Sequence, residues 1–98
     1  MKYEIKSHCV RKIVLFYLNV AKKYKHTYSK DLERKNVSDA YDALFQIEKT
    51  LPRRRPTLLR WQQQCWHMAH TGKWYYAYTV NEDTITIEDA CHEQNMHD

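Results

Sequence analysis

This sequence contains very little glycine and no long hydrophobic stretch, and each shortage excludes a class of protein. Gly72 is the only glycine among 98 residues, so the glycine-rich loops that bind nucleotide phosphates are absent. The longest apolar run, residues 13–18, is far shorter than the ~20 residues that a membrane-spanning helix needs. The start of the chain lacks the pattern of a secretory signal. We therefore expect a single cytoplasmic domain over residues 1–98.

The cysteines and histidines show no spacing typical of a disulfide framework or a metal site. Cys9, Cys65 and Cys91 form an odd set without a CxxC motif, which is typical of reduced thiols. His67 and His70 fall in an expected strand, where this spacing points their side chains to opposite faces. Zinc sites usually show tight paired spacings, so we expect neither a metal nor a cofactor.

Charge is divided unevenly along the chain. Residues 1–64 contain 15 Lys and Arg against 6 Asp and Glu, whereas residues 65–98 contain 1 against 6. Such asymmetry favours a basic face that meets a polyanion or an acidic partner segment. The alternative is that the helices simply expose solvated lysines.

The first half of the chain begins with an amphipathic helical pattern. From Cys9 to Tyr24 apolar residues recur at three- and four-residue steps, which is typical of a helix with one buried face. Leu15 stands among Arg11 and Lys22, with Phe16 at the edge of the apolar stripe. This is more apolar surface than one sheet face needs to cover, so it suits the docking of a partner helix with acidic flanks, or it is ordinary scatter of exposed apolar residues.

A second helical pattern follows. Ser29 is a suitable N-cap, and Pro52 ends the pattern. Asn36 followed by Asp39 resembles an internal cap, so we expect the helix to bend or restart there. Two such helices with a short connection predict an antiparallel hairpin.

The rest of the chain alternates polar and apolar residues, which indicates strands separated by tight turns. A short strand over residues 2–6 precedes the helices, and four more are expected at residues 57–62, 64–70, 74–80 and 84–91. We predict an α+β fold in which the helical hairpin packs on one face of a mainly antiparallel C-terminal sheet. The other face would then be open, concave and partly aromatic.

This order of elements resembles the RelE/ParE superfamily of small toxins from bacterial type II toxin–antitoxin systems. The likeness is strongest in the last third, where Gly72–Val80 is similar to the family's aromatic-rich penultimate strand and Asp83–His92 to its last strand. The resemblance implies a cytoplasmic growth inhibitor that a cognate antitoxin neutralises. It also implies one of two targets, mRNA in the ribosomal decoding site or DNA gyrase.

One departure from the family pattern separates these activities. The RNA-cutting relatives usually place Arg on the middle strands, but Cys65–His70 and Lys73–Tyr76 contain none. This favours inhibition by binding a target such as gyrase without hydrolysis. The alternatives are a ribosome-dependent mRNA endoribonuclease and a non-toxic member of the superfamily that serves as a binding module.

If the protein cleaves RNA, the reaction needs a base, an acid and a cation near the phosphate. His67 and His92 are the candidates for proton transfer, because imidazole titrates near neutral pH. Glu48 lies in the apolar stripe of the second helix, where it forms an ion pair with a neighbouring Arg or, as in some RNA-cutting relatives, acts as a general base. The alternative is that His67 and Tyr75 lie on a solvated face of the sheet and have no catalytic role.

Contacts with a nucleic acid or another target are expected from a basic cluster and one aromatic ring. Three arginines between Pro52 and Pro56 form an extended loop suited to phosphate contacts, although a merely solubilising loop is equally common. Tyr75 could stack on a base. The candidate target-binding residues are Arg53, Arg54, Arg55, Arg60 and Tyr75.

Overall fold

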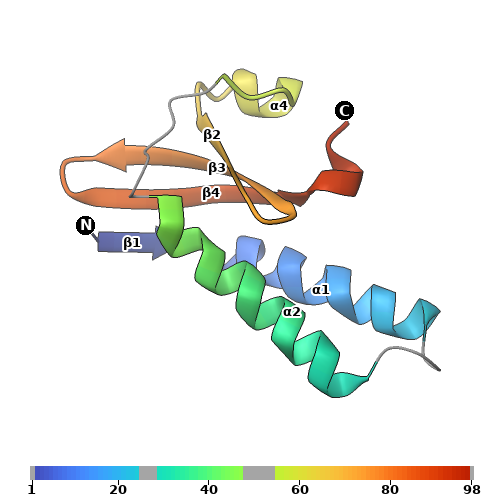
Figure 1. Ribbon diagram of the computed structural model, residues 1–98. Helices are drawn as coiled ribbons and strands as arrows, with labels where there is room; N and C mark the ends of the chain where they lie inside the picture. Colours follow the sequence, from blue (N-terminus) through green and yellow to red (C-terminus); the bar gives the residue numbers. More distant parts are fainter. Residues whose placement is uncertain (1, 25–28, 48–54, 98) are drawn as a thin grey trace.

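The structure is a computed structural model that describes residues 2–24, 29–47 and 55–97. The α+β fold is confirmed: two helices pack on a four-stranded, mostly antiparallel sheet (Figure 1). In chain order the elements are β1 (Lys2–Ile5), α1 (Ser7–Lys23), α2 (Lys30–Ala43), the 3-10 turn η1 (Leu44–Gln46), α4 (Leu59–Gln62), β2 (His67–Thr71), β3 (Trp74–Asn81), β4 (Thr84–His92) and the 3-10 turn η2 (Glu93–Asn95).

The strands are ordered β1-β4-β3-β2, with β1 parallel to β4 and the other pairs antiparallel. The turn between β2 and β3 uses Gly72 at φ +63, and the turn between β3 and β4 uses Glu82 at φ +56. The register of β3 against β4 shifts between Ala77 and Tyr78. The backbone register skips Glu88, as in a β-bulge, and this increases the local twist.

The helical hairpin follows the predicted pattern, with one correction. The Ser29 hydroxyl accepts a hydrogen bond from the Leu32 N–H at 3.1 Å, which confirms the predicted N-cap of α2. The predicted restart at Asn36 and Asp39 is wrong, because α2 continues through both residues. Its buried side chain, Ala40, lies on the stripe that packs on the sheet, and this packing outweighs the local capping signal.

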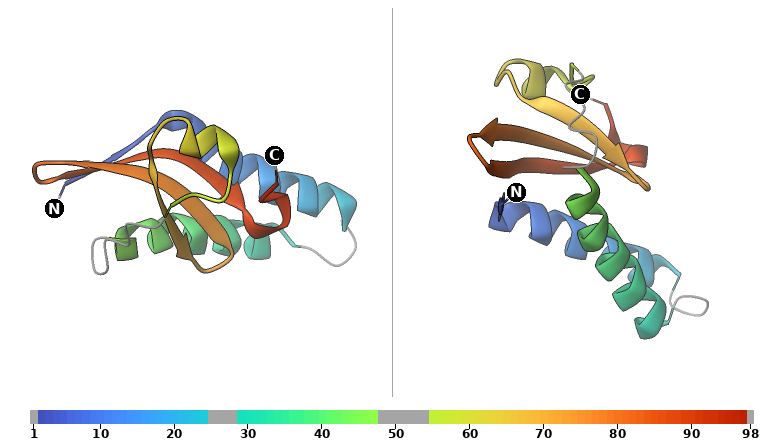
Figure 2. Two further views of the ribbon diagram at one scale, coloured as in Figure 1. Left: turned by 90° about the horizontal axis from the view of Figure 1, so that it is seen from above. Right: turned by 60° about the vertical axis from the view of Figure 1, so that its left-hand side comes forward.

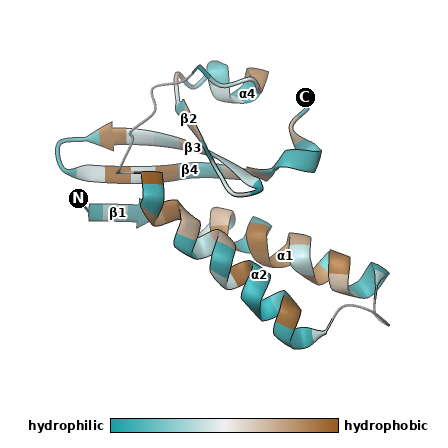
Figure 3. Ribbon diagram, in the orientation of Figure 1, coloured by the Kyte–Doolittle hydropathy of each residue, from teal (hydrophilic) through white to brown (hydrophobic). Residues whose placement is uncertain are grey.

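The main core lies between the helical hairpin and one face of the sheet (Figures 1 and 2). In Figure 3 hydrophobic and hydrophilic stretches alternate along both helices, as a one-sided burial requires. The Tyr76 hydroxyl donates to the Ala40 carbonyl at 2.9 Å, and the Trp74 indole N–H donates to the Tyr17 hydroxyl at 3.0 Å. The sheet is thus joined to both helices by buried hydrogen bonds. The buried residues of this core are Cys9, Ile13, Tyr17, Ala40, Leu44, Ile47, Ala69, Trp74, Tyr76, Tyr78, Ile85, Ile87 and Ala90.

The segment between the arginine cluster and β2 differs from the prediction. Residues 57–62, expected to be a strand, form a bend followed by the short helix α4. Leu58 and Trp61 are 1% and 0% exposed, and their three-residue spacing places both on the same side of a helical turn. Burying these two large side chains together therefore explains why the segment is helical.

This segment also changes the far face of the sheet, which was expected to be open. Leu58 and Trp61 form a second core with Met68, Ala77 and Cys91, and with the half-buried Trp66, Tyr75 and Met96. The figures show α4 on the opposite side of the sheet from α1 and α2 (Figures 1 and 2). The sheet is therefore covered on both faces at its β2–β3 end, and the prediction of a wholly free face is wrong.

Candidate functional site

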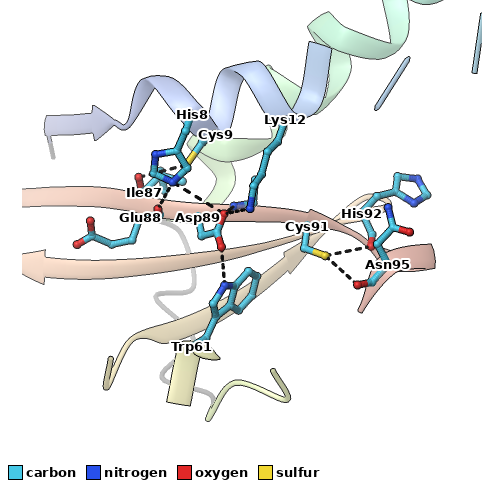
Figure 4. A network of polar contacts seen from close by, with 11 residues as sticks. His8, Cys9, Lys12, Trp61, Ile87, Glu88, Asp89, Cys91, His92 and Asn95 are labelled. Atoms are coloured by element: carbon cyan, nitrogen blue, oxygen red, sulfur yellow. Dashed lines mark hydrogen bonds and ion pairs between the residues drawn. The ribbon is translucent and has the colours of Figure 1, made fainter. Parts of the chain in front are cut away.

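Asp89, on β4, is the centre of a network of polar contacts (Figure 4). The ammonium group of Lys12, from α1, donates to its Oδ1 at 2.5 Å. The indole N–H of Trp61, from α4, donates to Oδ2 at 2.8 Å. The N–H of Ala90 also donates to Oδ1, at 2.8 Å. One carboxylate thus joins the helical hairpin, the sheet and the covering segment.

The protonation state of Asp89 follows from these contacts. Burial by itself would raise its pKa, but the hydrogen bonds from Lys12, Trp61 and Ala90 outweigh burial and hold the pKa below the ordinary value of 3.8. Asp89 is 8% exposed, and its charge is balanced by that of Lys12. The group is therefore an ionised structural acceptor whose oxygens are occupied, which argues against a role as a general base.

The two buried thiols beside this network, Cys9 and Cys91, are poor nucleophiles. Burial raises the pKa of Cys9 to about 12, with a further contribution from Asp89, and the Cys9 thiol donates to the Ile87 carbonyl at 3.6 Å. Burial also raises the pKa of Cys91, although the neighbouring charge of Arg60 opposes the rise. Low-pKa thiolates are the nucleophilic form of cysteine, so neither residue is a nucleophile here.

His92, one of the two predicted proton-transfer residues, lies at the floor of a groove. The groove has a volume of about 740 Å³ and lies between the helical hairpin and the β2–β3 turn with η2. The His92 ring stacks on Phe16 with centroids 4.0 Å apart, and Nδ1 accepts the Gln94 N–H at 3.2 Å. Burial lowers its pKa, although Glu93 opposes this. His92 is therefore a neutral, 4% exposed side chain.

The structure does not bring the two predicted histidines together. His67 pairs with Tyr78, and its half-buried ring lies 5.6 Å from that ring. His92 pairs with Trp74, on the other side of β3. Four residues along a strand correspond to about 13 Å, and the two histidines are on opposite sides of β3 as well. They therefore cannot act on the same phosphodiester.

The predicted target-binding residues are also dispersed. Arg55 is exposed and lies 3.4 Å from the Gln62 side chain, whereas Arg60 lies beside Cys91 on the far face. Tyr75 stacks on His70, with centroids 4.1 Å apart and an interplanar angle of 3°, so His70 already occupies one face of its ring. Glu48, Arg53 and Arg54 lie outside the described residues.

The outer surface of α1 is a second candidate site. Val14 and Leu15 are 39% and 46% exposed. Arg11 and Lys22 lie on the same side of the helix, one turn before and two turns after Leu15. α1 contains no Asp or Glu. Phe16, expected at the edge of this surface, instead packs inward against Trp74 and His92.

Other kinds of site find no support in the described residues. Over residues 2–24, 29–47 and 55–97 no three His, Cys, Asp or Glu side chains gather in a way that could hold a metal ion. None of the helices in these ranges is long and apolar enough to cross a membrane.

Sequence reasoning missed the Asp89 network entirely. Lys12 and Asp89 are separated by 77 positions, and Trp61 and Asp89 by 28. The only local signal was an aspartate among the apolar residues at the end of the last strand. Comparisons of the chain with known protein families, curated proteins and solved structures found no match.

Proposed function

We propose that this protein is the toxin of a type II toxin–antitoxin system, and that it inhibits growth by binding a target such as DNA gyrase without hydrolysing it. A cognate antitoxin neutralises it. The observation that carries the proposal is the outer surface of α1, where exposed Val14 and Leu15 lie between Arg11 and Lys22 in a helix that contains no acidic residue.

This surface has a definite chemical complement. Exposed aliphatic side chains flanked by cations suit an amphipathic helix whose apolar stripe is bordered by Asp and Glu. Its attraction is electrostatic as well as apolar, so binding weakens as the salt concentration rises. The acidic, amphipathic antitoxin that the RelE/ParE resemblance implies has this chemistry.

The dispersal of the catalytic candidates supports binding in preference to hydrolysis. General acid–base catalysis needs both groups within hydrogen-bond reach of one substrate. His92 is buried and neutral, and the register places it about 13 Å along the sheet from His67. Of the predicted target-binding arginines, Arg60 lies beside Cys91 on the far face of the sheet, away from His92's groove.

The proposal is tested by inducible expression in a bacterium, with and without the neighbouring reading frame. We expect growth arrest with intact mRNA and altered plasmid supercoiling, relieved when the neighbour is an acidic protein that binds this chain. Fragmented mRNA would instead establish the endoribonuclease alternative. Normal growth, with no small acidic protein encoded beside it, would argue for the non-toxic binding module.

The docking surface is tested separately by charge reversal. Leu15→Glu combined with Arg11→Glu places two carboxylates against an acidic partner, and we expect a loss of at least about tenfold in affinity by titration calorimetry. Leu32→Glu is the matched control, since Leu32 is 40% exposed on α2. Equal losses in the two variants would exclude α1 as the antitoxin surface.

A further inference from the structure

Residues 55–66, here called the flap, cover the far face of the sheet at its β2–β3 end. Two side chains anchor the flap: Leu58 and Trp61 are almost fully buried against Met68, Ala77 and Cys91. Figure 4 shows Trp61 reaching Asp89 from the side of β4 opposite to Lys12. The flap therefore conceals an apolar patch, defined here as Met68, Ala77 and Cys91.

The flap is largely self-contained. The backbone N–H groups of residues 61–66 all donate to carbonyls within the flap, and the Gln62 side chain donates to the Pro56 carbonyl at 2.7 Å. Its links to the sheet are made by side chains: Leu58, Trp61 and Trp66 pack in the second core, Trp61 donates to Asp89, Arg60 contacts Cys91, and the Thr57 hydroxyl lies 4.0 Å from the Met68 sulfur. A segment with its own backbone hydrogen bonds that is held to the core by side chains can move without breaking the strands.

The joint between the flap and β2 is strained. Cys65 has φ +59, in the left-handed region that only glycine adopts without cost. It is exposed, and β2 begins two residues later. Opening the flap allows this residue to leave the left-handed region, so the strain opposes closure while Trp61 and Leu58 favour it.

We propose that the flap opens as a unit, hinged at Cys65 and latched by Trp61 on Asp89, while the core between the helical hairpin and the sheet stays folded. Opening bares the apolar patch on the far face of the sheet. The proposal rests on this geometry alone and is independent of the proposed function.

The three cysteines report the opening in the intact chain. Cys65 is exposed, Cys91 lies under the flap, and Cys9 is 0% exposed in the main core. The rate at which iodoacetamide labels each cysteine is measured by mass spectrometry. Dividing this rate by the rate of the same thiol in urea-unfolded protein gives the extent to which each site opens. We expect Cys65 to react at once. Cys91 should be labelled faster than Cys9, and its labelling rate should depend less on urea, because only global unfolding exposes Cys9.

Two variants separate flap opening from other routes to Cys91. Trp61→Phe removes the hydrogen bond to a charged acceptor and should speed labelling of Cys91 by at least about tenfold. Ile13→Val weakens only the main core, where Ile13 is 1% exposed, and should speed labelling of Cys9 by about fivefold while leaving Cys91 unchanged.

Three results would overturn the proposal. If Ile13→Val speeds the labelling of Cys91 as much as that of Cys9, the flap and the core unfold together. If Trp61→Phe leaves Cys91 unchanged, exposure arises at the C-terminal side, where the Cys91 thiol donates to the Asn95 carbonyl. If the labelling rates of Cys91 and Cys9 depend equally on urea in the wild type, that result alone would exclude a local opening.

Discussion

Replacing Asp89 with Asn tests whether one buried carboxylate holds the fold together. The substitution keeps the size of the side chain and one carbonyl oxygen, but replaces the other oxygen with an amide that can only donate. Lys12, Trp61 and the Ala90 N–H are all donors. At least one of them must therefore lose its acceptor and face another donor.

The magnitude follows from the exposure of each donor. The Trp61 N–H is fully buried, and a buried hydrogen bond to a charged group contributes about 1.5–3 kcal/mol. Lys12 is 44% exposed, so water compensates much of its loss and its ion pair contributes no more than about 1 kcal/mol. We expect Asp89→Asn to lower the free energy of unfolding by about 2–3 kcal/mol, a large share of the 5–15 kcal/mol typical of a domain.

Urea unfolding followed by tryptophan fluorescence measures this change. At pH 7 the midpoint should fall by about 1–2 M. The pKa of Asp89 in the folded protein is lowered, so its contribution is present above the ordinary value and is lost as the pH falls through the folded pKa. The difference between wild type and Asp89→Asn should accordingly persist from pH 7 to about pH 4 and shrink below that.

Two further variants decide whether the reasoning holds. Asp42→Asn changes an exposed aspartate of α2 and should shift stability by no more than about 0.5 kcal/mol. Lys12→Met should lower the free energy of unfolding by up to about 1 kcal/mol in the wild type and by less in the Asp89→Asn background, where the carboxylate charge is gone. The account is refuted if Asp89→Asn behaves like Asp42→Asn, or if its effect is the same at pH 3 as at pH 7.

Three other predictions test separate features of the fold. Because burial lowers the pKa of His92, its imidazole binds a proton more tightly in the unfolded chain than in the folded protein. Stability should therefore fall as the pH drops below 6.5, and thermal melts between pH 5 and 8 should show a smaller fall in His92→Asn. Ser29→Ala removes the acceptor of the Leu32 N–H and should lower the free energy of unfolding, measured in urea, by about 1 kcal/mol. Ser38→Ala, in the middle of α2, should not destabilise the protein. Gly72→Ala should cost about 1–2 kcal/mol through φ +63 alone, since an added Cβ meets no atom within 4 Å; a larger loss would mean a steric clash.

Features that depend on neighbours in the chain were predictable. The spacing of apolar residues correctly predicted α1, α2 and the strand β3. The Ser29 cap was predictable because its hydrogen bond spans three residues. In each case the partner groups lie within one helical turn or one strand repeat.

Features that depend on distant partners were predicted wrongly or missed. Residues 57–62 alternate like a strand, but burying Leu58 together with Trp61 selects a helix. His67 and His92 were the predicted proton-transfer pair, but the strand order places the two residues on opposite sides of β3. The Asp89 network was missed because its donors come from α1 and α4.

The sequence by itself determined the class of fold and the order of its elements outside residues 57–62, since periodicity and turn residues act over a few positions. Only the tertiary structure decided which polar groups meet, because hydrogen bonds and ion pairs require atoms within about 3–4 Å and chain separation says nothing of that distance. Lys12, Trp61 and Asp89 meet across three elements, whereas His67 and His92, which were predicted to act together, do not.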